Sequence, residues 1–235
     1  MGSYLVFASL LISLIYPHRP CQKLFNTYYK LFSMIERFRK DIDSKLNDLA
    51  KPFLKFSPNT LTLLSFFFAL LTPLTFYMVR FYKAALILAG VFIAISGIFD
   101  ALDGKVARLK TQESKKGDFL DHLLDRYSDF FIIGGFGLTG FCKLDFAFLG
   151  LIGTLFASYA GTQAEAVGVG RIYSGLLTRA DRLILLVFAP AVQFIFYGFF
   201  GFTILELICL AFFVLGQITA IQRAYFAWKE LSKKE

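Results

Sequence analysis

The sequence predicts an all-α integral membrane protein in which an N-terminal amphipathic juxtamembrane helix precedes six transmembrane helices. Hydrophobic residues make up 57% of the chain and charged residues only 18%, whereas a soluble domain usually carries about 25% charged residues. Six long apolar segments follow residue 57, and the basic residues gather in alternate connections between them. The apolar excess is therefore expected to face lipid, with the basic residues marking one side of the membrane.

Residues 1–33 form an extension ahead of the regular pattern. Residues 4–16 are apolar, but this stretch is short of the roughly 20 residues that a membrane span needs. No basic segment precedes it and no clear small-residue cleavage site follows, which argues against a cleaved signal peptide. We expect an interfacial or loosely packed extension. The alternative is that the natural start is Met34, where the organised pattern begins.

Residues 34–56 show the pattern of a basic amphipathic helix. Their apolar positions recur at steps of three or four, which is the spacing of a helical stripe. Arginines and lysines surround the stripe, as in helices that lie on an anionic membrane surface. A soluble surface helix is the alternative, but it requires a soluble domain that the chain lacks. The apolar positions are Ile35, Phe38, Ile42, Leu46, Leu49 and Phe53.

The six predicted transmembrane segments begin after Ser57-Pro58-Asn59, a sequence typical of a helix start because proline is favoured in the first turn. Short connections join them in pairs, and the last connection is an uncharged turn near residue 201. The segments lie near residues 60–80, 84–109, 117–140, 144–168, 179–200 and 203–228.

The distribution of basic residues predicts the orientation. Of the 25 lysines and arginines, only Arg80, Lys83 and Lys143 lie in the connections on one side. The positive-inside rule therefore predicts that both termini, the 105–116 loop and the 169–182 loop are cytoplasmic, in a multi-pass protein of the cell membrane.

The composition argues against nucleic acid as a partner and against a cysteine-based metal site. The formal net charge of +8 fits this topology, and the sequence has no recognisable nucleic-acid-binding motif. The three cysteines, Cys21, Cys142 and Cys209, are far apart and predict neither a disulfide framework nor a zinc site. The only histidines are His18 and His122, which make a poor set of metal ligands without cysteine neighbours. Carboxylates are therefore the expected ligands of any metal.

Two aspartate pairs flank one short loop. Asp100 and Asp103 are three residues apart near the end of the second segment, and Asp121 and Asp125 are four apart near the start of the third. Each pair shares a helical face, and the loop brings the two faces opposite each other. An unpaired charge near the membrane costs up to ~3 kcal/mol. Local lysines and arginines offer partial compensation, but oxygen ligands suit Mg²⁺ or Mn²⁺ better.

The residues after the first pair suit a phosphate-bearing ligand. Gly104 lies inside a helical run, where glycine costs about 1 kcal/mol relative to alanine, and its missing side chain lets a ligand approach closely. Ala107 continues this small face one turn on. Arg108 can then reach a phosphate with two hydrogen bonds.

Together these residues resemble the signature of the CDP-alcohol phosphotransferase family, which is D-x-x-D-G-x-x-A-R, eight residues, then G-x-x-x-D-x-x-x-D. The resemblance extends from Pro58-Asn59-Thr60-Leu61-Thr62 to the last helix and covers roughly residues 34–228. It implies a family domain over 34–230 with the predicted helix order, a homodimer, and a site open to the cytoplasmic leaflet. All eight fixed identities are present, at Asp100, Asp103, Gly104, Ala107, Arg108, Gly117, Asp121 and Asp125.

The resemblance also implies roles for these residues. Asp100, Asp103 and Asp121 would ligate metal, and Asp125 would complete the set, with two divalent ions, and act as general base. The alternative is a structural network of ion pairs with nearby lysines. The CDP group would be bound by Asn59, Thr62, Asp103, Gly104, Ala107, Arg108 and Gly117.

Three further polar residues have more ordinary interpretations. Asp118 and Asp129 extend the stripe of Asp121 and Asp125 at helical spacing. Asp129 lies about 18 Å along the segment from Gly117, where a polar contact between helices is expected rather than a ligand. His122 is expected to be a loop-side or packing histidine and not a base.

Several arginines are predicted to bind the phosphate of the acceptor alcohol. Arg171, Arg179 and Arg182 follow the fourth segment, and Arg223 lies near the cytoplasmic end of the sixth. Segment ends converge in a bundle, and several arginines in one cavity suit a phosphate. The alternative is the positive-inside bias combined with contacts to lipid headgroups.

Three stretches indicate the acceptor. Residues 175–186 and 222–228 resemble inositol-phosphate-using members of the family, and residues 159–171 are most similar to archaetidylinositol phosphate synthases. Gly161 and Gln163 depart from the bacterial phosphatidylinositol phosphate synthases, which tend to have lysine and arginine there.

The predicted reaction is transfer from CDP-archaeol or CDP-diacylglycerol to inositol 1-phosphate, with release of CMP. A close alternative is glycerol 3-phosphate as acceptor; serine fits less well because it needs no arginine-rich pocket. A membrane transporter or channel is the alternative of a different class, since intramembrane acids often mark ion paths. Such proteins usually bury charge near the midplane, whereas these acids gather at one face.

Overall fold

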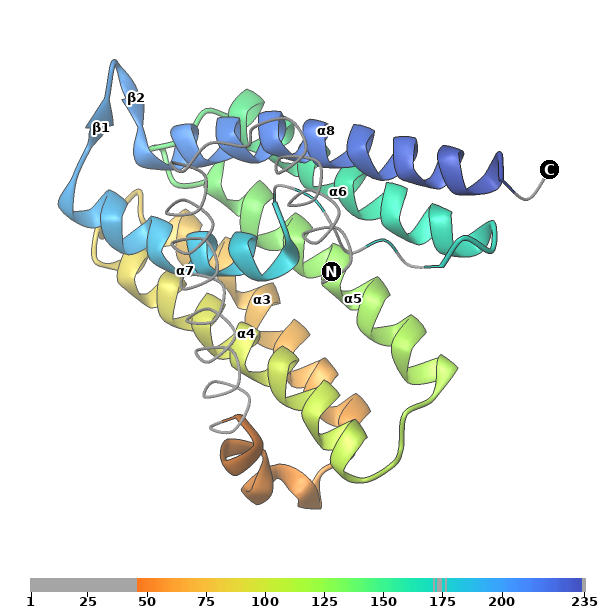
Figure 1. Cartoon of the computed structure of the whole chain (residues 1–235). Coiled ribbons are helices and arrows are strands. Elements are labelled where there is room, and N and C mark those ends of the chain that lie inside the picture. Colours follow the sequence, from red (N-terminus) through yellow and green to blue (C-terminus); the bar gives the residue numbers. More distant parts are fainter. Residues whose placement is uncertain (1–45, 171, 173–174, 176, 234–235) are drawn as a thin grey trace, which may run out of the picture. The chain divides into compact units, whose positions relative to one another are not determined.

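The structure is a computed structural model that describes residues 46–170, 172, 175 and 177–233 (Figure 1). The chain divides into two compact units, Met1–Pro52 and Phe53–Glu235. In the first unit, residues 46–50 are helical, and the 3₁₀ helix η1 (Lys51–Lys55) follows. The predicted extension 1–33 and most of the predicted amphipathic helix 34–56 lie outside the described residues.

The described part of the second unit is helical apart from one short hairpin. Its six α-helices correspond one to one with the six predicted segments. The helices are α3 (Pro58–Met78), α4 (Ala85–Leu109), α5 (Lys115–Phe136), α6 (Leu144–Ala166), α7 (Arg179–Ile195) and α8 (Ile204–Leu231).

Four of these helices, α3, α4, α6 and α8, are long and apolar enough to cross a membrane. The other two lack this property for different reasons. Helix α5 carries Asp118, Asp121, Asp125, Arg126 and Asp129 among its first 15 of 22 residues, and α7 has only 17 residues. Length and hydropathy therefore identify four candidate membrane spans among the described helices, of the six predicted.

Side-chain caps fix where the helices begin. The Ser57 hydroxyl accepts a hydrogen bond from the Thr60 amide at the start of α3, and the Ser114 hydroxyl accepts one from the Gly117 amide at the start of α5. Thr178 begins α7 with a capping box that includes Asp181. These bonds satisfy amides that have no partner within the helix, so the caps set the positions of the motif-bearing first turns.

The predicted fifth segment ends earlier than expected. Helix α7 stops at Ile195, and strands β1 (Gly198–Phe199) and β2 (Phe202–Thr203) form an antiparallel hairpin in place of its last turn. Phe200 and Gly201, at the tip, both have positive φ angles, of 54° and 81°. A helix cannot pass through such a turn, and the prediction that the helix continues to residue 200 was wrong for this reason.

Each helix packs against two others, so the six form a closed ring in the order α3, α4, α7, α8, α6 and α5. The α6–α8 contact is especially close because glycines face each other. A Cβ added at Gly216 would lie 2.9 Å from the Gly153 Cα atom, and one added at Gly150 would lie 3.0 Å from the Cys209 Cα atom. The buried core inside this ring includes Phe76, Phe136 and Phe212.

Candidate functional site

The two predicted aspartate pairs meet at one end of the ring, where α4 ends and α5 begins. Asp100 and Asp103 belong to α4, and Asp121 belongs to α5. One carboxylate oxygen from each of the three lies within 4.8 Å of the others. Oxygen ligands at this spacing are suited to Mg²⁺ or Mn²⁺, so the fold provides the predicted three-carboxylate set.

The burial of these oxygens supports a cation site. The Oδ2 atom of Asp103 and the Oδ1 atom of Asp121 are buried and have no hydrogen-bond partner among the described residues. A buried carboxylate oxygen without a partner is costly unless a cation compensates it. The residues present therefore fit a divalent ion, with Asp100, Asp103 and Asp121 as the residues that would hold it.

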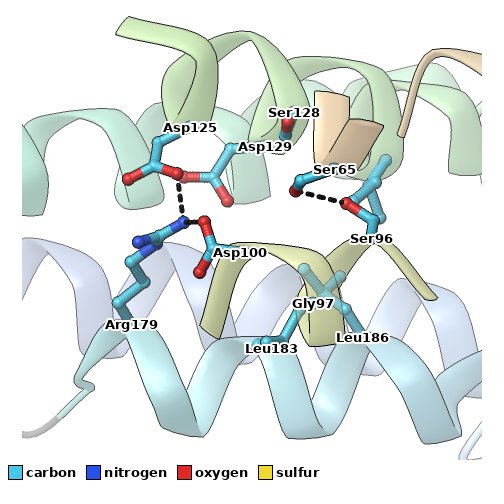
Figure 2. Close-up of a pocket in the computed structure, with 11 residues that line it drawn as sticks. Ser65, Ser96, Gly97, Asp100, Asp125, Ser128, Asp129, Arg179, Leu183 and Leu186 are labelled. Atoms are coloured by element: carbon cyan, nitrogen blue, oxygen red, sulfur yellow. Dashed lines mark hydrogen bonds and ion pairs between the residues drawn. The ribbon is translucent and has the colours of Figure 1, made fainter. Parts of the chain in front are cut away.

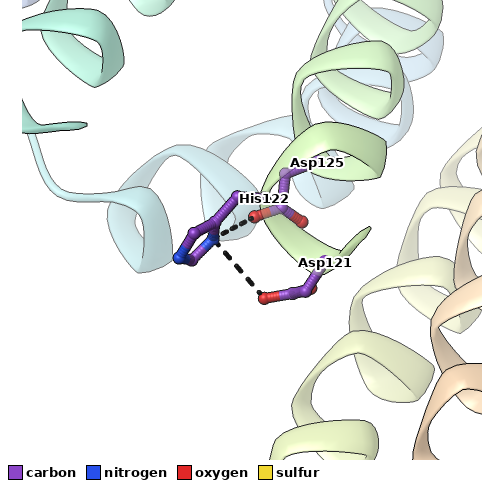
Figure 3. A group of neighbouring side chains, drawn as sticks. All are labelled: Asp121, His122 and Asp125. Carbon is purple, nitrogen blue, oxygen red and sulfur yellow. Dashed lines mark ion pairs between the residues drawn. The ribbon is translucent and has the colours of Figure 1, made fainter. Parts of the chain in front are cut away.

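A second group of possible ligands overlaps the first and includes a histidine (Figure 3). Asp121, His122 and Asp125 place one ligand atom each within 4.8 Å of one another. The Nδ1 atom of His122 lies 3.7 Å from Asp121 Oδ2 and 4.0 Å from Asp125 Oδ2, and its Nε2 atom lies 3.0 Å from Asp118. His122 was expected to be a loop-side or packing residue, yet it faces the aspartates at the edge of the site.

Part of the predicted CDP-binding set surrounds the first group. Thr62 lies on α3 near the Asp103 carboxylate, and its hydroxyl donates to the Pro58 carbonyl at 3.2 Å. The Asn59 Oδ1 atom lies 3.4 Å from the position of a Cβ added at Gly117, so the first turns of α3 and α5 are in contact. A Cβ added at Gly104 would meet only Arg108, at 3.9 Å. The backbone of Gly104 is therefore accessible, as a closely bound ligand requires.

The other two residues of that set lie on the outer part of α4. Ala107 is half-buried and Arg108 is exposed. The loop after them is held in place by Lys110, whose Nζ donates to the Phe56 carbonyl at 3.2 Å. An exposed arginine beside an accessible glycine is available to a ligand that approaches from outside the ring.

Arg179, which is predicted to bind acceptor phosphate, contacts two of the aspartates (Figure 2). Its Nη2 atom donates to Asp100 Oδ1 at 2.6 Å and also to Asp125 Oδ1. The Asp125 side chain is only 6% exposed, whereas that of Arg179 is 44% exposed. The first residue of α7 thus connects α4 with α5 at the centre of the predicted metal site, an arrangement that the sequence did not reveal.

Arg182, one turn further along α7, has a different partner. Its side chain is 3% exposed, and its Nη2 atom lies 3.4 Å from Asp129 Oδ2 on α5. Arg126 lies 3.2 Å from the same oxygen. The expectation that Asp129 makes a polar contact between helices is confirmed. Arg182 Nε is buried without a hydrogen-bond partner among the described residues.

Arg223 and Arg171 complete the predicted arginines. Arg223 is buried on α8, and its Nη1 atom donates to the Ala157 carbonyl of α6 at 2.7 Å. The same nitrogen would lie 3.0 Å from a Cβ added at Gly161, so glycine there leaves space for the guanidinium. Arg171 lies outside the described residues.

A pocket with an empty volume of about 410 Å³, part of it open to the outside, extends from Arg179 into the ring (Figure 2). Its lining includes three aspartates beside Arg179, namely Asp100, Asp125 and Asp129, together with two serines. These serines, Ser65 on α3 and Ser96 on α4, are buried and share a hydrogen bond of 3.2 Å. The pocket thus combines carboxylates, a guanidinium and hydroxyls within an otherwise apolar bundle.

Sequence reasoning missed three of these features. His122 could have been noticed because it lies four residues after Asp118 and beside Asp121, which is ion-pair spacing on a helix. No local signal predicts the contacts of Arg179 with Asp100 and Asp125, since these residues are more than 50 positions apart. The Ser65–Ser96 contact likewise depends on how α3 and α4 pack.

Comparison with known proteins agrees with the geometry. The family model described as CDP-alcohol phosphatidyltransferase matches residues 55–222. The archaetidylinositol phosphate synthase of Pyrococcus horikoshii is 34% identical over 200 residues, which cover 84% of this chain and 98% of that protein. The enzyme of the same description from Methanothermobacter thermautotrophicus is 33% identical over 149 residues, covering 63% of this chain and 74% of that protein.

Solved structures share the fold. The phosphatidylinositol phosphate synthase of Mycobacterium tuberculosis in complex with manganese and citrate superposes with a TM-score of 0.65 and 24% sequence identity, covering 78% of this chain and 88% of that one. The same protein with CDP-DAG bound gives a TM-score of 0.61, covering 78% of this chain and 93% of that one. At this level of identity the likeness concerns the arrangement of the helices.

Proposed function

Because this chain belongs to the CDP-alcohol phosphatidyltransferase family, we propose that it transfers a phosphatidyl or archaetidyl group from a CDP-lipid to inositol 1-phosphate and releases CMP. The chain is thus a metal-dependent transferase of phospholipid biosynthesis. The proposal rests mainly on two buried carboxylate oxygens, one on Asp103 and one on Asp121. Neither oxygen has a hydrogen-bond partner among the described residues, and both residues belong to the family signature. These atoms need a cation, and the reaction needs one at the same place.

The bound metal would neutralise the pyrophosphate of the CDP-lipid and stabilise the leaving CMP. Asp100, Asp103 and Asp121 would hold one ion, and the overlapping group of Asp121, His122 and Asp125 supports a second. Arg108 is exposed beside Gly104 and would donate two hydrogen bonds to a phosphate of the donor. Asn59 and Thr62, at the start of α3, would orient the cytidine part against Gly117.

Asp125 is proposed as the general base. In the reaction, a hydroxyl oxygen of the acceptor forms a bond to the phosphorus that carries the lipid. The bond from that phosphorus to the oxygen of CMP breaks, and the hydroxyl proton passes to the Asp125 carboxylate. The side chain is almost fully buried at the wall of the pocket, so little water competes for its oxygens.

The acceptor is inferred from the arginines and from the relatives. Arg179 and Arg182 open α7 beside the aspartates, and Arg223 approaches from α8. Several guanidinium groups suit a phosphate dianion. The two archaeal relatives are archaetidylinositol phosphate synthases, which supports inositol 1-phosphate and an ether-lipid donor. The ester donor CDP-diacylglycerol remains within the proposal, because the apolar helices do not distinguish the two lipids.

The four long apolar helices and the family make this a multi-pass membrane protein. We further propose that α5 and α7 also cross the membrane, with their charged first turns at the cytoplasmic side. Three of the 25 basic residues lie in the connections opposite the site, which supports a cytoplasmic site and cytoplasmic termini. A homodimer, and contacts with the surrounding lipids, are part of the same proposal.

An acceptor panel tests the proposed reaction. The purified chain is given CDP-archaeol or CDP-diacylglycerol, Mn²⁺ and one acceptor, and CMP release is measured. We expect release with inositol 1-phosphate, none without metal, and little with free inositol. Equal rates with free inositol and inositol 1-phosphate would refute phosphate recognition. Release with glycerol 3-phosphate alone would identify a different acceptor, and no CMP release with any acceptor would favour a transporter.

A further inference from the structure

Arg179 uses one nitrogen atom to contact two carboxylates from two other helices. Its Nη2 atom donates both of its hydrogens, to Asp100 of α4 and to Asp125 of α5 (Figure 2). Asp100 belongs to the first group of possible metal ligands and Asp125 to the second. The guanidinium therefore contacts two carboxylates that a divalent ion would also use, and the two cations compete for the same residues.

Charge determines which cation suits the site in each state. When all four aspartates are ionised they carry four negative charges. One guanidinium neutralises one of these charges, whereas two divalent ions neutralise all of them. Once the ions are present, the guanidinium is a surplus positive charge beside two dications, and like charges repel strongly where water is largely excluded. Arg179 is thus favoured at the aspartates without metal and disfavoured there with it.

We propose that Arg179 is a built-in counter-ion that the divalent metal displaces, and that the displaced side chain then binds the acceptor phosphate. The second half of this statement rests on the proposed function, because it takes a phosphate-bearing acceptor as given; the first half does not. The α7 backbone remains fixed by the Thr178–Asp181 capping box, so only the arginine side chain has to move. With 44% of that side chain exposed, it has space to do so.

The same displacement exposes an oxygen of the proposed base. Arg179 donates to Asp125 Oδ1, so that oxygen can accept a hydrogen bond from the acceptor hydroxyl only after the guanidinium has moved. The same movement completes the acceptor site. Metal binding therefore precedes productive acceptor binding, and Arg179 is a positioning residue that couples the two events.

Arg182 provides a matched control on the same helix. It is also an arginine beside an α5 aspartate, but its partner, Asp129, belongs to neither group of possible metal ligands. Its side chain is buried, whereas that of Arg179 is half-exposed. Removal of either arginine takes one positive charge from this end of α7. A general electrostatic effect would therefore change the metal affinity in both variants, whereas direct competition for the metal ligands would change it only when Arg179 is removed.

The first experiment measures metal affinity without any substrate. The full chain in lipid nanodiscs is titrated with Mn²⁺, and the free ion is followed by electron paramagnetic resonance. We expect Arg179→Gln to bind Mn²⁺ at least tenfold more tightly than the wild type, and Arg182→Gln to remain within about twofold. Unchanged or weaker binding in Arg179→Gln overturns the proposal, as does equal tightening in both variants.

A second variant protects the test against misfolding. Should Arg179→Gln not fold without metal, Arg179→Lys replaces it, because a compact ammonium group lacks the planar fork of a guanidinium and holds two carboxylates less well. We expect Arg179→Lys to bind Mn²⁺ more tightly than the wild type, by a smaller factor. Its melting temperature should be below that of the wild type without metal and equal to it with saturating Mn²⁺. A deficit that persists with Mn²⁺ indicates a merely structural role and overturns the proposal.

The second experiment tests transfer of the arginine to the acceptor. Binding of inositol 1-phosphate is measured by calorimetry with and without Mn²⁺. We expect the wild type to bind only with Mn²⁺ and Arg179→Gln to lose most of that binding. Equal binding without metal overturns the transfer. If the Mn²⁺ competition holds but neither condition gives binding, the proposed acceptor is wrong while the counter-ion role stands.

Discussion

Arg182 and Asp129 form a buried ion pair between α7 and α5, with 3.4 Å between Nη2 and Oδ2. Asp129 follows Asp125 by one turn of α5 and lines the same pocket. Both side chains are largely removed from water, so Arg182 depends on Asp129 for compensation of its charge, whereas Asp129 also has Arg126 at 3.2 Å. Arg182 is predicted to bind acceptor phosphate, and this ion pair gives it a structural role as a second interpretation.

A double-mutant cycle separates these two roles. Removal of one partner of a buried pair costs about 3–5 kcal/mol, so Asp129→Asn, which leaves Arg182 unpaired, should lower the melting temperature strongly. Arg182→Gln should lower it less, because Asp129 keeps its contact with Arg126. The double variant should recover much of the loss. The KM for inositol 1-phosphate is then measured in the double variant. A KM about tenfold or more above that of the wild type, equivalent to ~1.4 kcal/mol per decade, indicates that Arg182 contacts the acceptor. A wild-type KM there would assign Arg182 to stability alone.

The three proposed metal ligands are tested by removing their charge. Asp100→Asn, Asp103→Asn and Asp121→Asn should each abolish CMP release while the protein stays folded, because an amide oxygen is a weaker ligand for a hard cation than a carboxylate. Mn²⁺ affinity should fall in each variant. The measurement pairs CMP release with thermal melting in detergent. Near-normal turnover in any one of the three would exclude that residue from the set.

Asp125 is expected to affect turnover more than donor binding. Loss of a general base typically lowers the rate by about 10²–10⁴-fold, so Asp125→Asn should reduce kcat by that range while the CDP-lipid still binds within a few-fold of the wild type. Asp118→Asn is the matched control, since Asp118 is an exposed carboxylate on the same helix. If Asp125→Asn loses donor binding as severely as Asp103→Asn, Asp125 is an essential ligand and not a base.

The close α6–α8 crossing predicts opposite effects for two glycine substitutions. A Cβ at Gly216 would meet the backbone of Gly153, which cannot move aside cheaply, whereas a Cβ at Gly134 would meet nothing within 4 Å. Gly216→Ala should therefore destabilise the protein by about 1–3 kcal/mol. Gly134→Ala should be neutral or stabilising, since alanine is favoured in helices by about 1 kcal/mol. Equal melting temperatures for the two variants would contradict the crossing.

The six helices of the second unit were predictable because each contains a long apolar run, and some also have a recognisable start. Ser57 and Ser114 are typical cap residues, and they are the caps that the structure uses. The hairpin after α7 was not predictable, because a stretch rich in Phe and Tyr is as apolar as a helix. Only Gly198 and Gly201 indicated a turn, and the predicted segment extended past the first.

The aspartates could be predicted to meet because the signature places them on adjacent helices with a short connection. The contacts of the arginines could not be predicted, because they depend on which arginine side chain lies closest to each aspartate once α7 packs against α4. The sequence showed four arginines on one side; the structure distinguishes their partners, with Arg179 on Asp100 and Asp125, Arg182 on Asp129, and Arg223 on the Ala157 carbonyl.

The short length of α7 has a consequence for the bilayer. A helix of 17 residues rises about 26 Å, which is less than the roughly 30 Å of a typical hydrocarbon layer. No charged residue occurs between Leu183 and Leu205, and Gln193 donates to the Phe196 and Tyr197 carbonyls that follow the helix. With α7 as a transmembrane segment, the hydrogen-bonded hairpin extends its apolar length. In that case the hydrophobic mismatch would be reduced without thinning the surrounding lipid, and the aromatic tip at Phe200 would lie at the headgroup level.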